Sequence, residues 1–187
     1  MAENRSATEP MPPSDWIRRF AHLVPAGGQV LDVAAGGGRH SRYFLDLGHP
    51  VVAVDIDIGK LADIGQRDGV EIIRADLEGD NAWPFPNRTF EAIVVTNYAH
   101  RPIFADLVAS LAPGGVLIYE SFGLGNERYG RPRSPDFLLR PGELWQAFAP
   151  ELQIVAYEHG YEASPRQSIR QRIAAVAGAE PVPLTAP

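Results

Sequence analysis

The stretch that decides the fold is VLDVAAGGGRHSRYF, residues 30–44. It opens with the apolar run VLDV (30–33), which is typical of a buried parallel strand. Small residues follow at 34–38 (AAGGG), and they let a ligand approach the backbone closely. Apolar and aromatic side chains then recur at a helical spacing through residues 39–47. Strand, glycine turn and helix predict a nucleotide-binding unit, because free N–H groups at the helix start face a bare turn.

The composition describes an ordinary globular chain. Its 187 residues are 45% hydrophobic and 21% charged, enough for one domain with a real core. We expect that domain at residues 14–177, with flexible tails at 1–13 and 178–187.

A net charge of −6 argues against broad nucleic-acid binding. The lack of cysteine excludes disulfides and thiolate metal sites, and we expect no metal. No membrane-length apolar run or signal-peptide core occurs, so we expect a cytoplasmic protein.

Short β-rich runs alternate with helical patterns along the chain. The predicted strands are residues 30–33, 51–54, 70–74, 90–96, 116–120, 152–157 and 168–176. The first predicted helix begins at Ser14 or Asp15. The other predicted helices cover residues 39–47, 59–66, 103–111 and 141–148. Such alternation predicts right-handed βαβ crossovers, and therefore an α/β fold with a parallel sheet and helices on both faces.

Polar or glycine positions follow most of the predicted strands. They are Asp32, Gly36, Asp55, Asp76 and Asn97. In doubly wound sheets the ligand lies at the carboxyl ends of the strands, near the point where the strand order reverses. These residues therefore predict one binding site along one rim of the sheet.

The acidic residues distinguish between possible ligands. Asp55 is placed to accept hydrogen bonds from a ribose diol, which both dinucleotides and adenosyl compounds contain. Asp32, at the end of the first strand, would repel a pyrophosphate but attract an ammonium group; the alternative is that it caps the following helix. Asp76 can accept from the adenine amino group, or can simply form a turn. This pattern favours S-adenosylmethionine (SAM), which has an ammonium, a sulfonium and no phosphate.

An ordered set of motifs resembles the class I, Rossmann-like SAM-dependent methyltransferases. The segments are VLDVAAGGG, VVAVDID, RADLEG, WPFPNRTFEAIVV and LAPGGVLIYE, in order over residues 29–120. More narrowly, GGGRHSRYFLDLGHPVVAVD is similar to small bacterial members around the tellurite-resistance methyltransferases. One departure is Ala34, where the family usually has glycine, and its methyl group can crowd the methionine part of the cofactor.

The resemblance implies a doubly wound sheet of about seven strands, mostly parallel, with a C-terminal antiparallel strand. It also implies a methyltransferase that binds SAM and releases S-adenosylhomocysteine (SAH). The residues expected to bind the cofactor are Asp32, Ala34, Gly36, Gly38, Asp55, Ile56, Ala75, Asp76, Leu77 and Asn97.

Three residues after the fourth strand are candidates for the acceptor side, where the family brings substrate to the methyl group. Tyr98, His100 and Arg101 can shape the acceptor pocket, and an imidazole can remove a proton near neutral pH. The alternative is that Asn97 caps the next helix and Tyr98 packs on the cofactor. The arginine-rich loop at residues 125–140 is either a lid that offers guanidinium groups to an anionic substrate or a solvated surface loop.

The acceptor cannot be read from these motifs, and we expect a small molecule, with RNA and protein acceptors as alternatives. Methyl transfer needs no particular catalytic side chain, because the sulfonium is already activated and alignment supplies much of the rate. A non-catalytic SAM-binding protein is therefore an alternative. An NAD(P)-dependent oxidoreductase is another, but it needs an apolar residue in place of Asp32.

Overall fold

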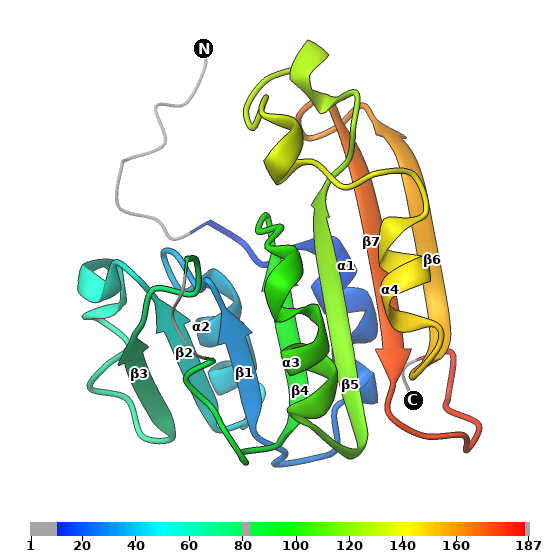
Figure 1. Cartoon of the computed structure of the whole chain (residues 1–187). Coiled ribbons are helices and arrows are strands. Elements are labelled where there is room, and N and C mark those ends of the chain that lie inside the picture. The colour runs from blue at the N-terminus through cyan, green and yellow to red at the C-terminus, as the bar shows by residue number, and fades with distance from the viewer. Residues whose placement is uncertain (1–10, 80–82, 186–187) are drawn as a thin grey trace, which may run out of the picture.

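The computed structural model describes residues 11–79 and 83–185, and its centre is a seven-stranded sheet (Figure 1). The strand order is β3-β2-β1-β4-β5-β7-β6. The strands are β1 (Val30–Val33), β2 (Val51–Asp55), β3 (Val70–Arg74), β4 (Phe90–Thr96), β5 (Leu111–Phe122), β6 (Gln153–Glu162) and β7 (Ser168–Val176). Every neighbouring pair is parallel except those that include β7. This confirms the predicted Rossmann-like α/β fold.

Helices cover both faces of the sheet, as the alternating pattern predicts. They are α1 (Asp15–Phe20), α2 (Arg39–Asp46), α3 (Phe104–Ala109) and α4 (Glu143–Phe148). Trp16 and Phe44 place α1 and α2 in one apolar cluster, while Leu107 and Phe148 place α3 and α4 in the cluster on the other face. Because β1, β2 and β4 are buried between these layers, their sequences are almost continuously apolar.

Four strands have the predicted bounds, and the differences elsewhere have local causes. The helix predicted at residues 59–66 is only a 3₁₀ turn, Ile58–Leu61, followed by turns, since two glycines weaken helix formation there. The helix predicted at 103–111 ends at Ala109. Residues 112–115, which separate the predicted helix at 103–111 from the predicted strand at 116–120, lie inside β5, where the pairing with β4 shifts register.

Strand β6 runs five residues beyond its predicted end at residue 157. Arg172 on β7 stands opposite Glu120 on β5 and Glu158 on β6 in the strand registers. Its guanidinium pairs with Glu120 at 3.0 Å, Glu158 at 3.4 Å and Glu162 at 2.6 Å. Opposite charges across strands stabilise pairing, so a polar segment that lacks a clear apolar alternation still extends the sheet.

The predicted tails lie partly outside the described residues, which exclude 1–10 and 186–187, and residues 80–82 of the loop before β4 are excluded too. Of the remainder, residues 11–13 line a pocket at the rim of the sheet. Val182 packs against the cluster that contains α1, and His22 contacts the carbonyl of Pro183 at 3.2 Å. None of the helices in the described part of the chain has the length and apolar character needed to cross a membrane.

Candidate active site

The glycine turn after β1 is tied to the end of β2. Gly36 has a φ of +57°, and its N–H donates to Oδ2 of Asp55 at 2.7 Å. The other carboxylate oxygen of Asp55 accepts from the N–H of Asp57 at 2.8 Å. An ionised carboxylate can accept about four hydrogen bonds. Asp55 is therefore held in place by the backbone and keeps the capacity to accept from two hydroxyl groups.

A cavity of about 320 Å³ opens beside this turn. We call it the acidic crevice, and its lining residues are Ala34, Asp55, Ile56, Ala75, Asp76, Leu77, Glu78 and Tyr98. Six of them are among the predicted cofactor residues. Three carboxylates face this space, and its described lining contains no lysine or arginine. The crevice thus favours a ligand that is cationic and rich in hydrogen-bond donors.

Tyr98 closes one side of the crevice rather than standing apart from it. Burial, and then the negative charges of Glu78, Asp76 and Asp55, raise the pKa of its hydroxyl. The phenol is therefore protonated at neutral pH and can act as a donor. This position fits the alternative in which Tyr98 packs on the cofactor better than a role in removing a proton. Glu78 was missed from the sequence, because an exposed Glu in a turn has no distinguishing pattern.

Ala34 occupies a backbone conformation that glycine adopts more easily. Its φ is +52°, in the left-handed region, and it lines the acidic crevice. A Cβ in that region costs about 1–2 kcal/mol. Strained non-glycine residues cluster at functional sites, and the family's usual glycine at this position is explained by the same φ.

Asp32 lies behind the turn and is almost fully buried. Its Oδ2 accepts hydrogen bonds from Ser41 in α2, from the backbone N–H at 2.9 Å and from the hydroxyl at 2.6 Å. Burial raises the pKa of this carboxyl group from 3.8 to about 6, although the Ser41 bonds oppose the change. The structure thus shows the helix-capping contacts that were the alternative to an ammonium contact, and Asp32 is not among the residues that line the acidic crevice.

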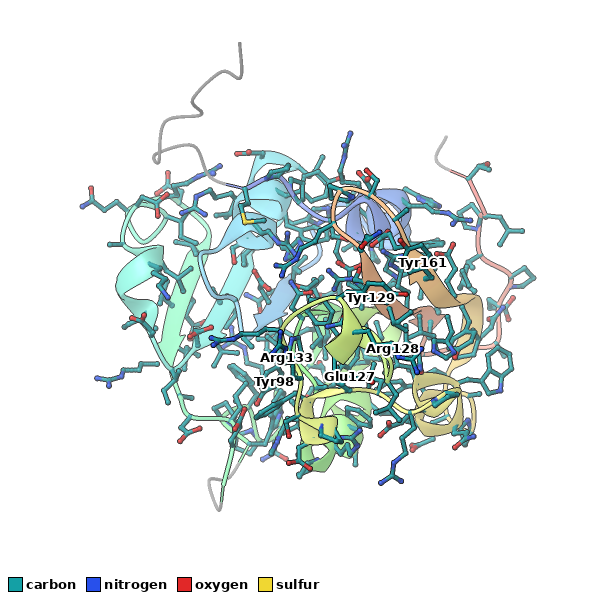
Figure 2. The ribbon with its side chains drawn as sticks, turned by 90° about the horizontal axis from the view of Figure 1, so that it is seen from above. Tyr98, Glu127, Arg128, Tyr129, Arg133 and Tyr161 are labelled. Carbon is teal, nitrogen blue, oxygen red and sulfur yellow. The ribbon has the colours of Figure 1, made fainter. Side chains whose placement is uncertain are left out.

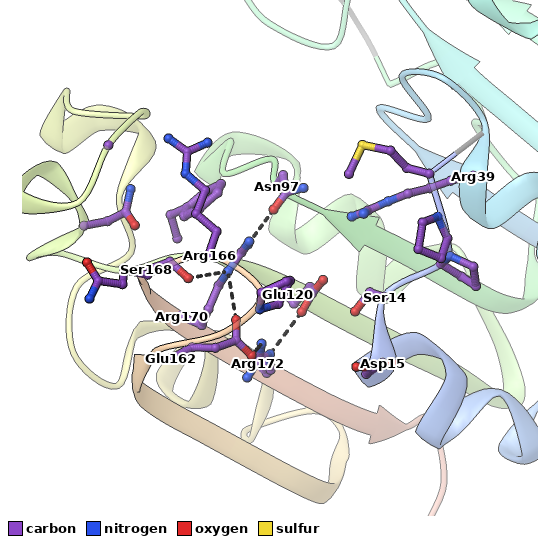
Figure 3. A pocket seen from close by; sticks show the side chains of 18 of the residues that line it. Ser14, Asp15, Arg39, Asn97, Glu120, Glu162, Arg166, Ser168, Arg170 and Arg172 are labelled. Atoms are coloured by element: carbon purple, nitrogen blue, oxygen red, sulfur yellow. Dashed lines mark hydrogen bonds and ion pairs between the residues drawn. The ribbon is translucent and has the colours of Figure 1, made fainter. Parts of the chain in front are cut away.

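A second cavity, of about 440 Å³, lies where the ends of β4 and β5 and the start of β7 meet the starts of α1 and α2 (Figure 3). We call it the arginine pocket, because its lining includes Arg18, Arg39, Arg131, Arg166, Arg170 and Arg172. Acidic lining residues are Asp15, Glu120 and Glu162. Arg39, directly after the glycine turn, carries no sequence signal that separates it from a solvated helix residue.

Asn97 lines the arginine pocket and not the acidic crevice, which differs from its predicted contact with the cofactor. Its φ is +55°, and its Oδ1 accepts a hydrogen bond from Arg170. The next residue, Tyr98, lines the acidic crevice. The two cavities are therefore neighbours, on either side of the residues that follow β4.

Arg101 and His100 line neither of these cavities. Arg101 pairs with Glu143 at 2.5 Å and donates to the carbonyls of Asp136 and Leu138 at 2.7 and 2.9 Å. It thereby ties the loop after β5 and the start of α4 to the turn that follows β4. The ring of His100 lies 6.1 Å from that of Tyr98, centroid to centroid.

The arginine-rich loop is a folded segment in the described structure. Leu138 and Leu139 are buried, and two 3₁₀ turns, Asn126–Arg128 and Pro135–Phe137, lie within it. Tyr129 stacks against Tyr161 of β6 with ring centroids 5.2 Å apart (Figure 2). Of its arginines, Arg131 lines the arginine pocket. The loop therefore supplies part of a wall, and its movement as a lid stays a prediction.

The chain is similar in sequence to known methyltransferases. Residues 30–115 match the family model described as a methyltransferase domain. The chain is similar to a demethylmenaquinone methyltransferase of Renibacterium salmoninarum, at 33% identity over 116 residues. It is also similar to the ubiquinone/menaquinone biosynthesis C-methyltransferase UbiE of Pseudomonas savastanoi, at 32% over 124 residues. Each match covers 57% of this chain and 47% of the relative, so the chain spans about half the length of these curated relatives.

Solved structures share the fold at low sequence identity. TehB from Haemophilus influenzae has a TM-score of 0.68 at 17% identity, covering 87% of this chain and 61% of TehB. The 1,6-didemethyltoxoflavin-N1-methyltransferase of Burkholderia thailandensis, solved with SAH, has a TM-score of 0.62 at 20% identity, covering 88% and 76%. The chain therefore has the class I, Rossmann-like methyltransferase fold.

Proposed function

We propose that this chain binds SAM in the acidic crevice and transfers its methyl group to a small molecule in the arginine pocket. The observation that carries the proposal is the arrangement of Asp55 at the end of β2, held against the N–H of Gly36, with Asp76 across the same cavity. Asp55 suits a ribose diol and Asp76 an adenine amino group, since carboxylates accept O–H and N–H donors. The Gly36 turn leaves bare backbone for the methionine part.

The charge of the crevice favours SAM over a dinucleotide. A pyrophosphate would have to bind close to Asp55, Asp76 and Glu78 without a lysine or arginine in the described lining. SAM is cationic at sulfur and at its ammonium group, so the same charges attract it. The NAD(P)-dependent alternative therefore has no support from the crevice.

A small-molecule acceptor is supported by the size of the arginine pocket and by the names of similar proteins. A volume of about 440 Å³ lies within the usual range for small-molecule sites. The similar proteins are named for quinone precursors and for a toxoflavin precursor. Protein and RNA acceptors remain outcomes of the test below.

When bound, SAM supplies a methyl group on a sulfonium, a leaving group that needs no further activation. The part of the protein is then mostly positional. Asp55 and Asp76 would hold the adenosine, the Gly36 turn would admit the methionine part, and Tyr98 would separate the cofactor from bulk water. Asn97, next to Tyr98, would stand where the two ligands meet.

A methyl-transfer assay with labelled SAM and a cell extract tests the proposal. The extract is separated into small molecules, RNA and protein, and we expect a labelled small molecule other than SAM itself only when the enzyme is present. Label in RNA or protein would change the acceptor class. Tight SAH binding with no transfer to any fraction would instead favour a non-catalytic SAM-binding protein.

A further inference from the structure

We infer that the arginine pocket selects acceptors that carry an anionic carboxylate or phosphate group, held by Arg39 and Arg166. This inference rests on the proposed function, because it names the substrate class of the same site. Both anionic groups share the planar or branched oxygen pair that a guanidinium binds through two N–H donors.

The charge of the pocket departs from that of the chain. Six arginines and three acidic residues line it, an excess of three positive charges, whereas the whole chain carries −6. The neighbouring acidic crevice is lined by three carboxylates. A uniform surface would not separate charge in this way across one rim of the sheet, so the two cavities suit ligands of opposite charge.

Three of the six arginines already have acidic partners. Arg172 pairs with three glutamates, and Arg18 pairs with Asp15 at 3.5 Å. Arg170 lies over the ring of Phe122 at 3.9 Å, donates to Asn97 and approaches Glu162 at 3.8 Å. These contacts fix the floor of the pocket and neutralise much of its charge.

The other three arginines, Arg39, Arg131 and Arg166, form no ion pair within the described residues. Arg39 and Arg166 lie on opposite sides of the pocket, with Asn97 between them (Figure 3). Arg39 directly follows the glycine turn, and Arg166 belongs to the segment that joins β6 to β7. An anion between them would place the rest of the acceptor beside Asn97, where the pocket meets the crevice.

Binding of simple probes to the SAH-saturated protein tests the inference by calorimetry. The probes are benzoate and phenyl phosphate, with benzamide as an uncharged molecule of the same shape as benzoate. We expect at least one anion to bind while benzamide does not. Arg39→Gln and Arg166→Gln should each weaken that binding about tenfold or more, since hydrogen bonds to charged groups are the strong ones.

Arg133→Gln is the matched control, because Arg133 is an exposed arginine that lines neither cavity and forms no ion pair in the described structure. If Arg133→Gln weakens binding of the anion equally, the effect depends only on the net charge of the protein, and the inference is wrong. Equal binding of benzamide would also overturn it. If Arg39→Gln weakens SAH but not the anion, Arg39 serves the cofactor's carboxylate, and its assignment to the acceptor is wrong.

The two levels of the proposal fail separately. If the wild-type protein binds no SAH, the proposed function fails before any probe is added. If SAH binds but neither anion does, only the inference on substrate class fails. A second readout is the labelled-SAM assay with the small-molecule fraction passed over an anion exchanger: label that is retained supports an anionic acceptor, and label that flows through contradicts one.

Discussion

Oδ2 of Asp55 accepts a hydrogen bond of 2.7 Å from the backbone N–H of Gly36, and this bond joins the ends of two neighbouring strands. It holds the glycine turn open and fixes the carboxylate that faces the acidic crevice. Its partners lie 19 residues apart in sequence, but parallel pairing of β1 with β2 places them side by side.

Ala34→Gly should stabilise the protein. Glycine adopts the observed φ of +52° without the clash that Cβ causes, so we expect the free energy of unfolding to rise by about 1 kcal/mol. Urea denaturation followed by circular dichroism measures the change. Ala35→Gly is the control, because Ala35 does not have a positive φ and glycine there should lower stability by about 0.5–1 kcal/mol. Equal effects of the two changes would show that backbone strain at Ala34 is not the cause.

Two glycines of the turn should respond differently to alanine. A Cβ on Gly38 would lie 2.7 Å from Cδ2 of Leu61, which is fully buried, and the φ is +71°. We expect Gly38→Ala to lower the free energy of unfolding by about 2–4 kcal/mol. A Cβ on Gly36 meets only the Ala34 carbonyl at 4.0 Å, so Gly36→Ala should cost about 1–2 kcal/mol.

The same pair separates folding from binding. Because the space beside Gly36 is open, we expect Gly36→Ala to weaken SAH binding in calorimetry while the protein still folds. A Gly36→Ala protein that binds SAH as the wild type does would place the cofactor away from this turn.

Asp32 should make the free energy of unfolding depend measurably on pH. Its pKa is raised from 3.8 to about 6 in the folded protein, so the folded state binds the proton more tightly than the unfolded state. This carboxyl group therefore lowers stability above pH 6, and the penalty disappears as the pH falls toward 4. Relative to Asp32→Asn, the wild type should gain about 1–2 kcal/mol between pH 7.5 and 5.

The difference in stability between the wild type and Asp32→Asn separates the effect of Asp32 from that of His40, whose titration changes stability in the opposite direction. Burial lowers the pKa of His40 from 6.5 to about 3, so its protonation in the unfolded state destabilises the fold as the pH falls below 6.5. His40 is present in both proteins, and its effect cancels in the difference. A difference that does not change with pH would show that Asp32 ionises normally.

The sequence was sufficient for the parts of the fold that depend on burial and on strong turn signals. Strands β1, β2 and β4 are almost continuous apolar runs. The ends of β2 and β3 place Asp55 and Asp76 where the crevice forms. The contacts that Arg101 makes with distant parts of the chain could not be predicted from the sequence. Arg101 begins a 3₁₀ turn three residues after Tyr98, and only the folded chain shows that Glu143 and two loop carbonyls bind it.

The arginine pocket could not be assembled from the sequence for a similar reason. Its walls come from segments more than 120 residues apart, including Arg39 and Arg166, and no periodic pattern connects them. Asn97 and Tyr98 show most clearly why the sequence was insufficient, because these adjacent residues of one turn line different cavities. Side-chain direction in such a turn depends on a φ of +55°, which the residue type allows but does not require.

Calorimetric titration of SAH into the wild type, Asp55→Asn and Asp68→Asn tests whether the acidic crevice binds the cofactor. Asp68 is an exposed aspartate with no ion pair or hydrogen bond in the described structure, so its replacement makes the same change of charge away from the crevice. We predict micromolar binding to the wild type and to Asp68→Asn, and binding at least tenfold weaker to Asp55→Asn, which loses charge-assisted hydrogen bonds to the ribose. Unchanged SAH affinity in Asp55→Asn would contradict the account.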